Sequence, residues 1–230
     1  MTKSIVHRSN KRMEYNVSNY SKIKEIILKL NSNEMLKGKL YIVGGTVPYI
    51  ISNTISNREH SDIDIIVEEK NMNTIREYLQ SNNLYDRKLD SLTFEYNKDK
   101  VDYGVDCFID GITVNFAPFK LINNGMLQRN FLSKQNSGIN ALVNVTMENI
   151  KLEDCITIYF VDQVQLKTYN LEMIKIMKEK SKKPKDQVDI KVIDEHGYNK
   201  EKYEELKVKT NNMKFNIYPK SRILRFFFNK

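Results

Sequence analysis

Two short segments of the sequence hold residues whose types and spacing suit chemistry on phosphate. Gly44-Gly45 follows the apolar run 40–43, and Asp62 and Asp64 stand in the run Asp-Ile-Asp-Ile-Ile-Val. Glycines after a strand let backbone N–H groups approach phosphate oxygens. Carboxylates two positions apart on a strand present hard oxygen ligands from one face, which suits Mg²⁺ bridging a triphosphate. Together the segments predict half of a phosphoryl-transfer site, although a glycine pair by itself is also an ordinary turn.

The neighbouring residues predict the elements that hold these pairs. Residues 40–43 are a short apolar run that ends in glycine, so we expect a buried strand there. Thr46 can cap a helix of about two turns that follows the glycines. Residues 62–68 are rich in isoleucine and valine, and the period of a strand places Asp62 and Asp64 on one face.

Hydrophobic spacing and turn residues predict further elements of an α/β fold. Asp110-Gly111 is the two-residue signal of a β-hairpin turn. Apolar residues recur at helical spacing in two segments and alternate in three others. The expected elements are helices at 18–30 and 71–82 and strands at 91–97, 102–109 and 112–118.

The second part of the chain has a more helical pattern. Residues 119–160 give mixed signals, and we expect a crossover between domains there. Asp162 can cap a helix that continues to Met177. Pro184 and Gly197 mark the start and the end of another helix, since proline suits the first turn and glycine the position after the last.

The order of these elements predicts the fold class. We expect an α/β (α+β) protein with a mixed sheet, followed by a smaller and mainly α-helical domain. The expected divisions are a flexible arm at 1–17, a nucleotide-handling α/β domain at 18–125 and the helical domain at 126–230.

The segment from Tyr41 to Val67 resembles the nucleotidyltransferase superfamily, which has the polymerase-beta-like fold. The resemblance covers residues 39–68 well and extends loosely to about residue 120. The glycine pair and the run Arg-Glu-His-Ser-Asp-Ile-Asp look most like the aminoglycoside and lincosamide nucleotidyltransferases. A second, short likeness lies at 182–189, Lys-Lys-Pro-Lys-Asp-Gln-Val-Asp, which is also explained as a basic helix start with acidic residues at its first turn.

The resemblance implies a reaction and a set of site residues. Asp62 and Asp64 would hold Mg²⁺, and Gly44, Gly45 and Thr46 would bind the β and γ phosphates of a nucleoside triphosphate such as ATP or GTP. A nucleoside monophosphate would then pass to a hydroxyl of an acceptor, which the sequence leaves open as an antibiotic-like small molecule, a tRNA or a protein. Metal ions and fixed N–H dipoles would stabilise the charge that builds on the transferring group.

The third carboxylate of such a site has no direct counterpart. The resemblance implies an acid on a later strand, but the matching position holds Asn115, and an amide cannot act as a base. Counting outward from the Asp110-Gly111 turn places Asp106 opposite Asn115, so Asp106 is the candidate replacement. The alternative is that Asp106 is an edge-strand charge that bonds to Asn115.

Several basic residues are weaker candidates for contact with phosphate. Arg58 and His60 precede the aspartates, and Lys175 lies on the helix expected after Asp162. The alternative, which the sequence favours, is a solvated loop residue for Arg58 and His60 and a plain surface lysine for Lys175. His196 is explained by the dipole of its helix alone. Residues 214–230 mix basic and aromatic side chains, as proteins that bind single strands do, or dock a last strand into the core.

Composition limits the class of protein. The 37 Lys and Arg outnumber the 29 Asp and Glu, and the net charge of +8 favours anionic partners. No segment approaches the roughly 18 apolar residues of a membrane span, and residues 1–16 lack the apolar core of a signal peptide. We therefore expect a cytoplasmic protein with no membrane partner and with Cys107 and Cys155 as reduced, packed thiols.

Two functional hypotheses remain open from the sequence. The first is a Mg²⁺-dependent nucleotidyltransferase, favoured by the pair Asp62 and Asp64. The second is a catalytically degenerate module of the same fold that binds nucleotide or RNA, favoured by Asn115. The position of Asp106 separates them.

Overall fold

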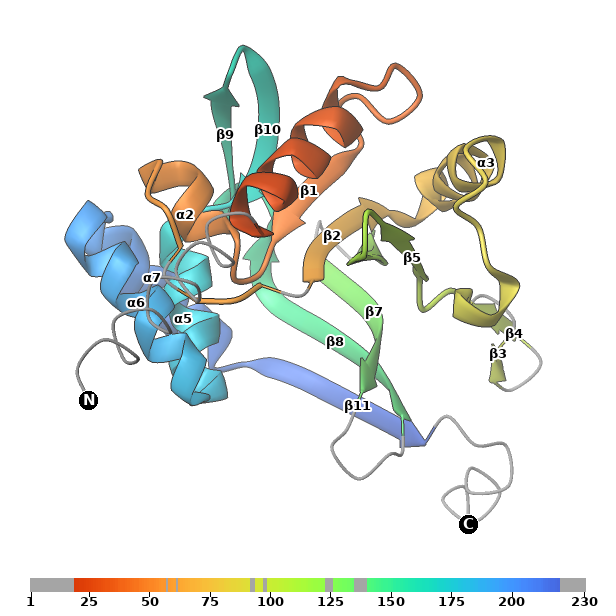
Figure 1. Cartoon of the computed structure of the whole chain (residues 1–230). Coiled ribbons are helices and arrows are strands. Elements are labelled where there is room, and N and C mark those ends of the chain that lie inside the picture. Colours follow the sequence, from red (N-terminus) through yellow and green to blue (C-terminus); the bar gives the residue numbers. More distant parts are fainter. Residues whose placement is uncertain are drawn as a thin grey trace, which may run out of the picture.

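A nine-stranded mixed sheet organises the described chain in the computed structural model, and two further strands pair in a small separate sheet (Figure 1). The structure describes residues 19–56, 58–60, 62–91, 94–96, 99–122, 126–134 and 140–219. Nine strands of this described part share the sheet, in the order β11-β8-β7-β6-β2-β1-β10-β9, with β5 paired to β6. The expected arm at 1–17 and the basic and aromatic residues at 220–230 lie outside the described residues.

The centre of the sheet is built from three strands. β1 (Leu40–Val43) pairs antiparallel with β2 (Asp62–Glu68), and β2 pairs parallel with β6 (Ile112–Ile122). Ile63, Ile65 and Val67 point to one side and are buried among the apolar residues of the core. The opposite side carries the polar residues of β2, so the alternation predicted for this strand is confirmed.

The other elements follow in chain order. The expected first helix covers 19–32 in the described chain. The remaining elements are α2 (Val47–Ser52), η1 (Glu69–Asn71), α3 (Met72–Ser81), η2 (Arg87–Leu89), β3 (Phe94–Tyr96), β4 (Asp99–Val101), β5 (Val105–Ile109), β7 (Met126–Lys134), β8 (Asn140–Lys151), α4 (Leu152–Cys155), β9 (Ile156–Val161), β10 (Val164–Tyr169), α5 (Leu171–Ser181), α6 (Pro184–His196), α7 (Lys200–Thr210) and β11 (Met213–Pro219).

The expected hairpin between β5 and β6 is confirmed. Asp110 and Gly111 both have positive φ, +50° and +79°, as a tight two-residue turn between strands requires. Ile109 pairs with Ile112 across the turn, and the ladder continues without a bulge to Val105. The register counted from the sequence is therefore the observed one.

The expected helix at Asp162 is wrong in its first half. Asp162 and Gln163 both have positive φ and form a tight turn between β9 and β10. The helix, α5, begins after Asn170, whose side-chain oxygen accepts a hydrogen bond from the backbone N–H of Met173 at 2.9 Å. Asp and Asn both tolerate positive φ and both cap helices, so residue type alone did not separate turn from cap.

The sheet continues into the second part of the chain. Strands β7 to β11 belong to the same sheet as β1 and β2, while the helices α5, α6 and α7 gather beside it (Figure 1). The expected fold class, a mixed sheet followed by a helical cluster, is confirmed. The expected boundary between 125 and 126 lies between two paired strands, β6 and β7, and a division into domains stays a prediction. No helix of the described chain is long and apolar enough to cross a membrane.

A buried arginine fastens α3 to the chain beyond it. Arg76 donates to both carboxylate oxygens of Asp90 and to both of Asp102, at 2.8 to 2.9 Å. All three side chains are at least nine-tenths buried. Burial lowers the pKa of Arg76, but its bonds to the two carboxylates outweigh this and hold it above the usual range.

We expect Arg76→Met to lower the free energy of unfolding by about 3–5 kcal/mol, because two buried carboxylates lose their counter-charge. Urea unfolding measures the change. Arg87→Met is the matched control, since Arg87 is exposed on η2, and no measurable effect is expected there. Equal stability of the Arg76 variant and the native protein would contradict the role of this network.

Candidate active site

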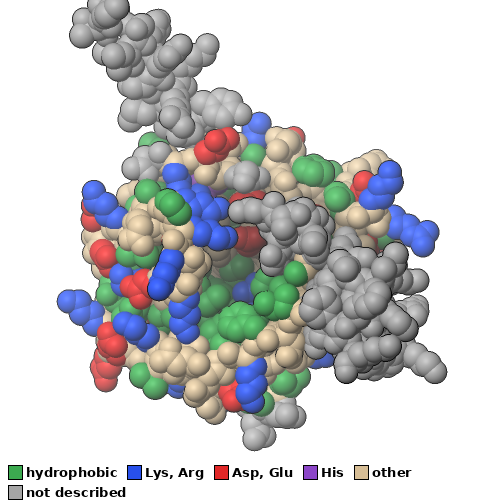
Figure 2. Space-filling model, turned by 90° about the horizontal axis from the view of Figure 1, so that it is seen from below, with side chains coloured by type: hydrophobic (Ala, Val, Ile, Leu, Met, Phe, Trp, Pro, Cys, Tyr) green, Lys and Arg blue, Asp and Glu red, His purple; other side chains and the backbone are tan. Residues whose placement is uncertain are grey.

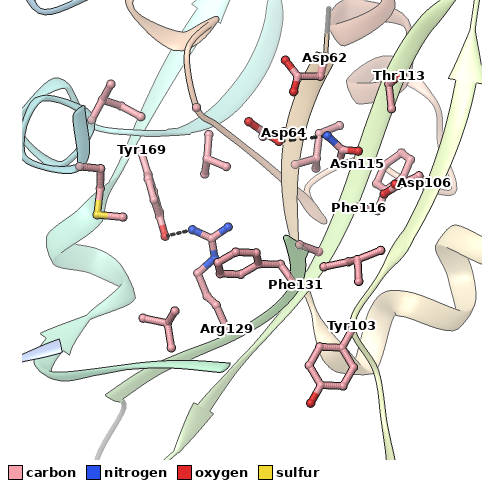
Figure 3. A pocket seen from close by; sticks show the side chains of 18 of the residues that line it. Asp62, Asp64, Tyr103, Asp106, Thr113, Asn115, Phe116, Arg129, Phe131 and Tyr169 are labelled. Carbon is pink, nitrogen blue, oxygen red and sulfur yellow. Dashed lines mark hydrogen bonds between the residues drawn. The ribbon is translucent and has the colours of Figure 1, made fainter. Parts of the chain in front are cut away.

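A row of polar side chains crosses three strands on the face opposite Ile63 and Ile65 of β2. Asp64 of β2 pairs with Asn115 of β6, and Asn115 pairs with Asp106 of β5. Asp62 pairs with Thr113, two residues earlier on the same two strands. Paired residues lie on the same face of a sheet, so both predicted acids, the asparagine and the candidate replacement acid Asp106 share one face, with Asp106 separated from Asp64 by the strand that carries Asn115 (Figure 3).

Asp64 is the most constrained carboxylate of the row. The Asn115 side-chain amide donates to Asp64 Oδ1 at 3.1 Å. Burial raises the pKa of Asp64, the charge of Asp62 raises it further, and the bond from Asn115 acts in the opposite direction. Asp62 itself is exposed. A divalent cation between the two carboxylates would relieve their repulsion.

The glycine turn packs directly against this acid. Gly44 has a φ of +82°, and a β-carbon placed on it would lie 2.5 Å from Asp64 Oδ2. Only glycine satisfies both the backbone angle and this close approach. The end of β1 and the middle of β2 are therefore held together at the point where the sequence predicts phosphate and metal to meet.

Gly45 faces a cluster of charged side chains on the other side of the turn. Arg58 binds both carboxylate oxygens of Asp189, at 2.6 and 3.0 Å, and reaches the Gly45 carbonyl oxygen at 3.4 Å. Lys178 of α5 lies 2.8 Å from Asp189 Oδ2 and 2.7 Å from Asp186 Oδ1. A β-carbon on Gly45 would meet the Arg58 guanidinium and would lie 3.3 Å from Lys178 Nζ. Two cations are thus fixed beside the glycines.

His60 and Thr46 are buried behind the turn. His60 Nε2 lies 2.7 Å from the Ser56 hydroxyl, and burial together with the nearby Arg58 charge lowers the pKa of His60 to about 3. His60 is therefore neutral at physiological pH and packs in the interior. Thr46 occupies the N-cap position of α2, but its hydroxyl makes no capping bond and is buried without a partner in the described structure.

The polar row opens into a cavity of about 610 Å³. Its size lies within the range of small-molecule sites. Figure 2 shows a hollow floored by hydrophobic side chains, with charged side chains beside it. The cavity is lined by Val43, Gly44, Asp62, Asp64, Ile65, Tyr103, Asp106, Thr113, Asn115, Phe116, Ala117, Arg129, Phe131, Leu132, Val145, Met147, Tyr169, Ile174, Met177, Lys178, Lys183 and Phe215.

Some predicted site residues do not line this cavity. Lys175 lies on another face of α5, where its ammonium contacts Asp194 at 2.9 Å and Glu179 at 3.2 Å and stands over the Tyr198 ring. Gly45 and Arg58 do not line the cavity themselves, but Gly45 adjoins two lining residues, Gly44 and Lys178, and Arg58 contacts Gly45. The structure thus does not bring Lys175 to the acid row.

Sequence reasoning missed the cations that do reach the cavity. Lys178 follows Lys175 by three residues on α5, and Lys183 and Arg129 also line the space. Lys178 pairs with Asp186 and Asp189 of the next helix, and a contact between two helices leaves no spacing signal in the sequence. Arg129 lies in the segment where the sequence pattern was mixed, so no pattern marked it.

The donor set suits a divalent cation held by two carboxylates. Within the described ranges, no group of three or more His, Cys, Asp or Glu side chains is close enough to hold a metal ion. Asp62 and Asp64 share one face, whereas Asn115 turns its NH2 group, and not its oxygen, towards Asp64. The residues therefore fit Mg²⁺ through this pair, with the substrate completing its coordination.

We expect Asp64→Asn to raise stability at pH 7. Because the folded state holds the pKa of Asp64 above its ordinary value of about 4, folding binds the proton more tightly, and stability falls as pH rises from that value through the raised one. Asparagine keeps an oxygen that can accept from Asn115. Urea unfolding at about five pH values between pH 4 and pH 8 measures the free energy of unfolding of the variant and of the native protein. The variant should be the more stable at neutral pH, and the difference should shrink towards pH 4.

Asp110→Asn serves as the control for this change. Asp110 is exposed on the hairpin turn, where asparagine tolerates the positive φ equally well. No gain is expected in that variant at any pH. A stability profile of Asp64→Asn that runs parallel to the native one would contradict the electrostatic cost assigned to this carboxylate.

Comparison with known proteins finds similarity in structure only. No protein-family model matches the chain, and no curated protein matches it. The lincosamide antibiotic adenylyltransferase LnuA, solved with lincomycin bound, is 15% identical, with 76% of this chain and 97% of that chain covered and a TM-score of 0.48. ANT(2'')-Ia, solved with adenylyl-2''-tobramycin, is 12% identical, with 84% and 97% covered and a TM-score of 0.49. A nucleotidyltransferase-like protein from Paracoccidioides brasiliensis is 12% identical, with 79% and 76% covered and a TM-score of 0.40.

The structures found include a lincosamide antibiotic adenylyltransferase and ANT(2'')-Ia. At such low identities and TM-scores these similarities are likenesses of overall fold. Activity, substrate and cofactor must be argued from the residues of the chain itself.

Proposed function

We propose that the protein is a Mg²⁺-dependent nucleotidyltransferase that moves a nucleoside monophosphate from a nucleoside triphosphate to a hydroxyl acceptor. The observation that carries the proposal is the packing of Gly44 against Asp64 at the cavity mouth, with Lys178 fixed beside Gly45. Backbone donors, carboxylates and a cation meet at one place. This is the set of groups that phosphoryl transfer requires.

Each group then has a role in binding the triphosphate. Asp62 and Asp64 would hold Mg²⁺, which when bound would offset the charge on the phosphates and on the transferring group. The backbone of Gly44, Gly45 and Thr46 would approach the β and γ phosphates, since the glycines leave room for close contact. Lys178 is the side-chain cation that lines the cavity on the same side. Arg58 would act by holding Asp189 and the Gly45 carbonyl in place.

The transfer step needs a proton acceptor. The acceptor oxygen would form a bond to the α phosphorus, the bond from that phosphorus to the bridging oxygen would break, and pyrophosphate would leave. The hydroxyl proton would pass to a base, for which we propose Asp106. Asp106 lines the cavity in line with Asn115 and Asp64, two strands from Asp64, or about 9–10 Å between backbones.

Asn115 favours one alternative function. It occupies the position between Asp64 and Asp106 and donates its amide to Asp64. If Asp106 does not take up the proton, the same cavity would bind a nucleotide or RNA without transferring any group. Under both functions the partners are a nucleoside triphosphate such as ATP or GTP and, for transfer, an antibiotic-like small molecule, a tRNA or a protein in the cytoplasm.

Asp62→Asn and Asp64→Asn should each lower Mg²⁺-dependent affinity for a nucleoside triphosphate by about ten-fold or more, because a charged ligand of the cation is lost. Titration calorimetry with a non-hydrolysable triphosphate, with and without Mg²⁺, measures the effect. Asp110→Asn is the control for a lost surface carboxylate and should bind as the native protein does. Unchanged affinity in both site variants would reject the assignment of the acid pair.

Asp106→Ala should lower transfer by a hundred-fold or more, about the contribution of a general base, while triphosphate affinity stays at the native value. Asn115→Asp should keep or raise transfer. The assay uses labelled ATP and GTP with Mg²⁺ and, as acceptors, total RNA, an antibiotic panel or protein. Native transfer rates in Asp106→Ala would contradict the role of the base. Triphosphate binding by the native protein without transfer to any acceptor would favour the binding module.

A further inference from the structure

A second charged group lines the cavity from strand β7, and its charge acts to lower the pKa of Asp64. Arg129 extends from β7 and its guanidinium carbon stands 5.8 Å from the centroids of both the Phe131 and Tyr169 rings (Figure 3). Its Nη1 donates to the Tyr169 hydroxyl at 3.3 Å. Its Nε is buried and has no hydrogen-bond partner, and no carboxylate of the described chain pairs with it.

This state is unusual among the buried arginines of the protein. Arg76 binds two carboxylates and Arg58 binds Asp189 through two bonds. A partly buried arginine that bonds to no carboxylate costs free energy, and a buried donor without an acceptor adds to the cost. Because Arg129 lines the cavity, a bound molecule is the group that can supply the missing acceptor.

The backbone of Arg129 lies at a distance from the predicted phosphate end. Arg129 pairs with Phe119 of β6, and Phe119 stands four residues beyond Asn115 on the same strand. At about 3.3 Å per residue this is roughly 13 Å along β6. A triphosphate already has the glycine turn and Lys178 at the other end. The acceptor is therefore the part of the reaction that Arg129 is placed to bind.

The wall around Arg129 is apolar. Hydrophobic side chains come from strands β7, β8 and β11 and from helix α5, and Figure 2 shows the hydrophobic floor of the hollow. Acidic residues among the cavity-lining side chains are confined to the polar row. The apolar lining residues on these elements are Phe131, Leu132, Val145, Met147, Ile174, Met177 and Phe215.

We propose that this part of the cavity is the acceptor subsite and that it takes a molecule with an apolar body and a carboxylate that pairs with Arg129. A planar guanidinium offers paired donors that match a carboxylate. A polycationic acceptor would place like charge against Arg129 and would find no acid in the apolar wall. The expectation that this molecule also carries a hydroxyl group rests on the proposed function. The expectation that its carboxylate pairs with Arg129 does not.

Three probes of one length test the subsite. They are ω-hydroxydecanoate, the neutral decanediol and the cationic ω-aminodecanol, titrated into the native protein by calorimetry without nucleotide or metal. The carboxylate should bind about ten-fold or more tightly than the other two, as a charge-assisted pair of bonds predicts. Arg129→Met should remove this preference, and Arg87→Met, an exposed arginine on η2, should keep it.

Two further variants keep the test decisive. Arg129→Lys retains the positive charge and a long side chain in the cavity. This variant should bind the carboxylate probe more weakly than the native protein does, because lysine lacks the paired donors. Asp62→Asn should keep the full preference for the carboxylate while losing Mg²⁺-dependent triphosphate binding, so a failure of the subsite and a failure of the proposed function give different results. Equal binding of the three probes to the native protein, or a preference that survives in Arg129→Met, would overturn the proposal.

Discussion

One buried carboxylate holds the glycine turn and the helices around it. Asp189 is fully buried on α6 and receives Arg58 through two bonds, Lys178 at 2.8 Å and the Tyr49 hydroxyl at 3.0 Å. These partners come from three separate parts of the chain, and Arg58 also reaches the Gly45 carbonyl. A buried carboxylate is stable only when its partners surround it. Asp189 therefore fixes both cations beside the turn, and without it they would face each other unscreened.

The register of the sheet is the second constraint. Since side chains alternate along a strand, the pairing of β2 with β6 and of β6 with β5 decides that Asp64, Asn115 and Asp106 share one face. A shift of one residue in either pair would bury an acid among the isoleucines. The large apolar content of the other face makes such a shift costly. The core thus sets the geometry of the polar row.

The sequence predicted most of what depends on local patterns. The acid pair on β2, the glycines after β1 and the hairpin at Asp110-Gly111 follow from strand alternation and turn chemistry, which act over a few residues. It did not predict Arg129 or the extension of the sheet through β7 and β8. β7 pairs with its neighbours in the chain, β6 and β8, but the alternation of β7 and β8 is interrupted by polar residues such as Asn130 and Asn144, which bond to each other across the strands.

Asn115 leaves the polar row with two acids on β2 and one on β5, and no acid between them on β6. An aspartate at this position would add a third negative charge next to Asp64, whose pKa burial and Asp62 already raise. The amide instead donates to Asp64 and holds that carboxylate in place as an acceptor-only ligand. Under the proposed function, proton uptake would fall to Asp106, one strand further from the acid pair. Charge binding and proton acceptance would thus be separated across β6, which lets the affinity for triphosphate and the rate of transfer vary independently.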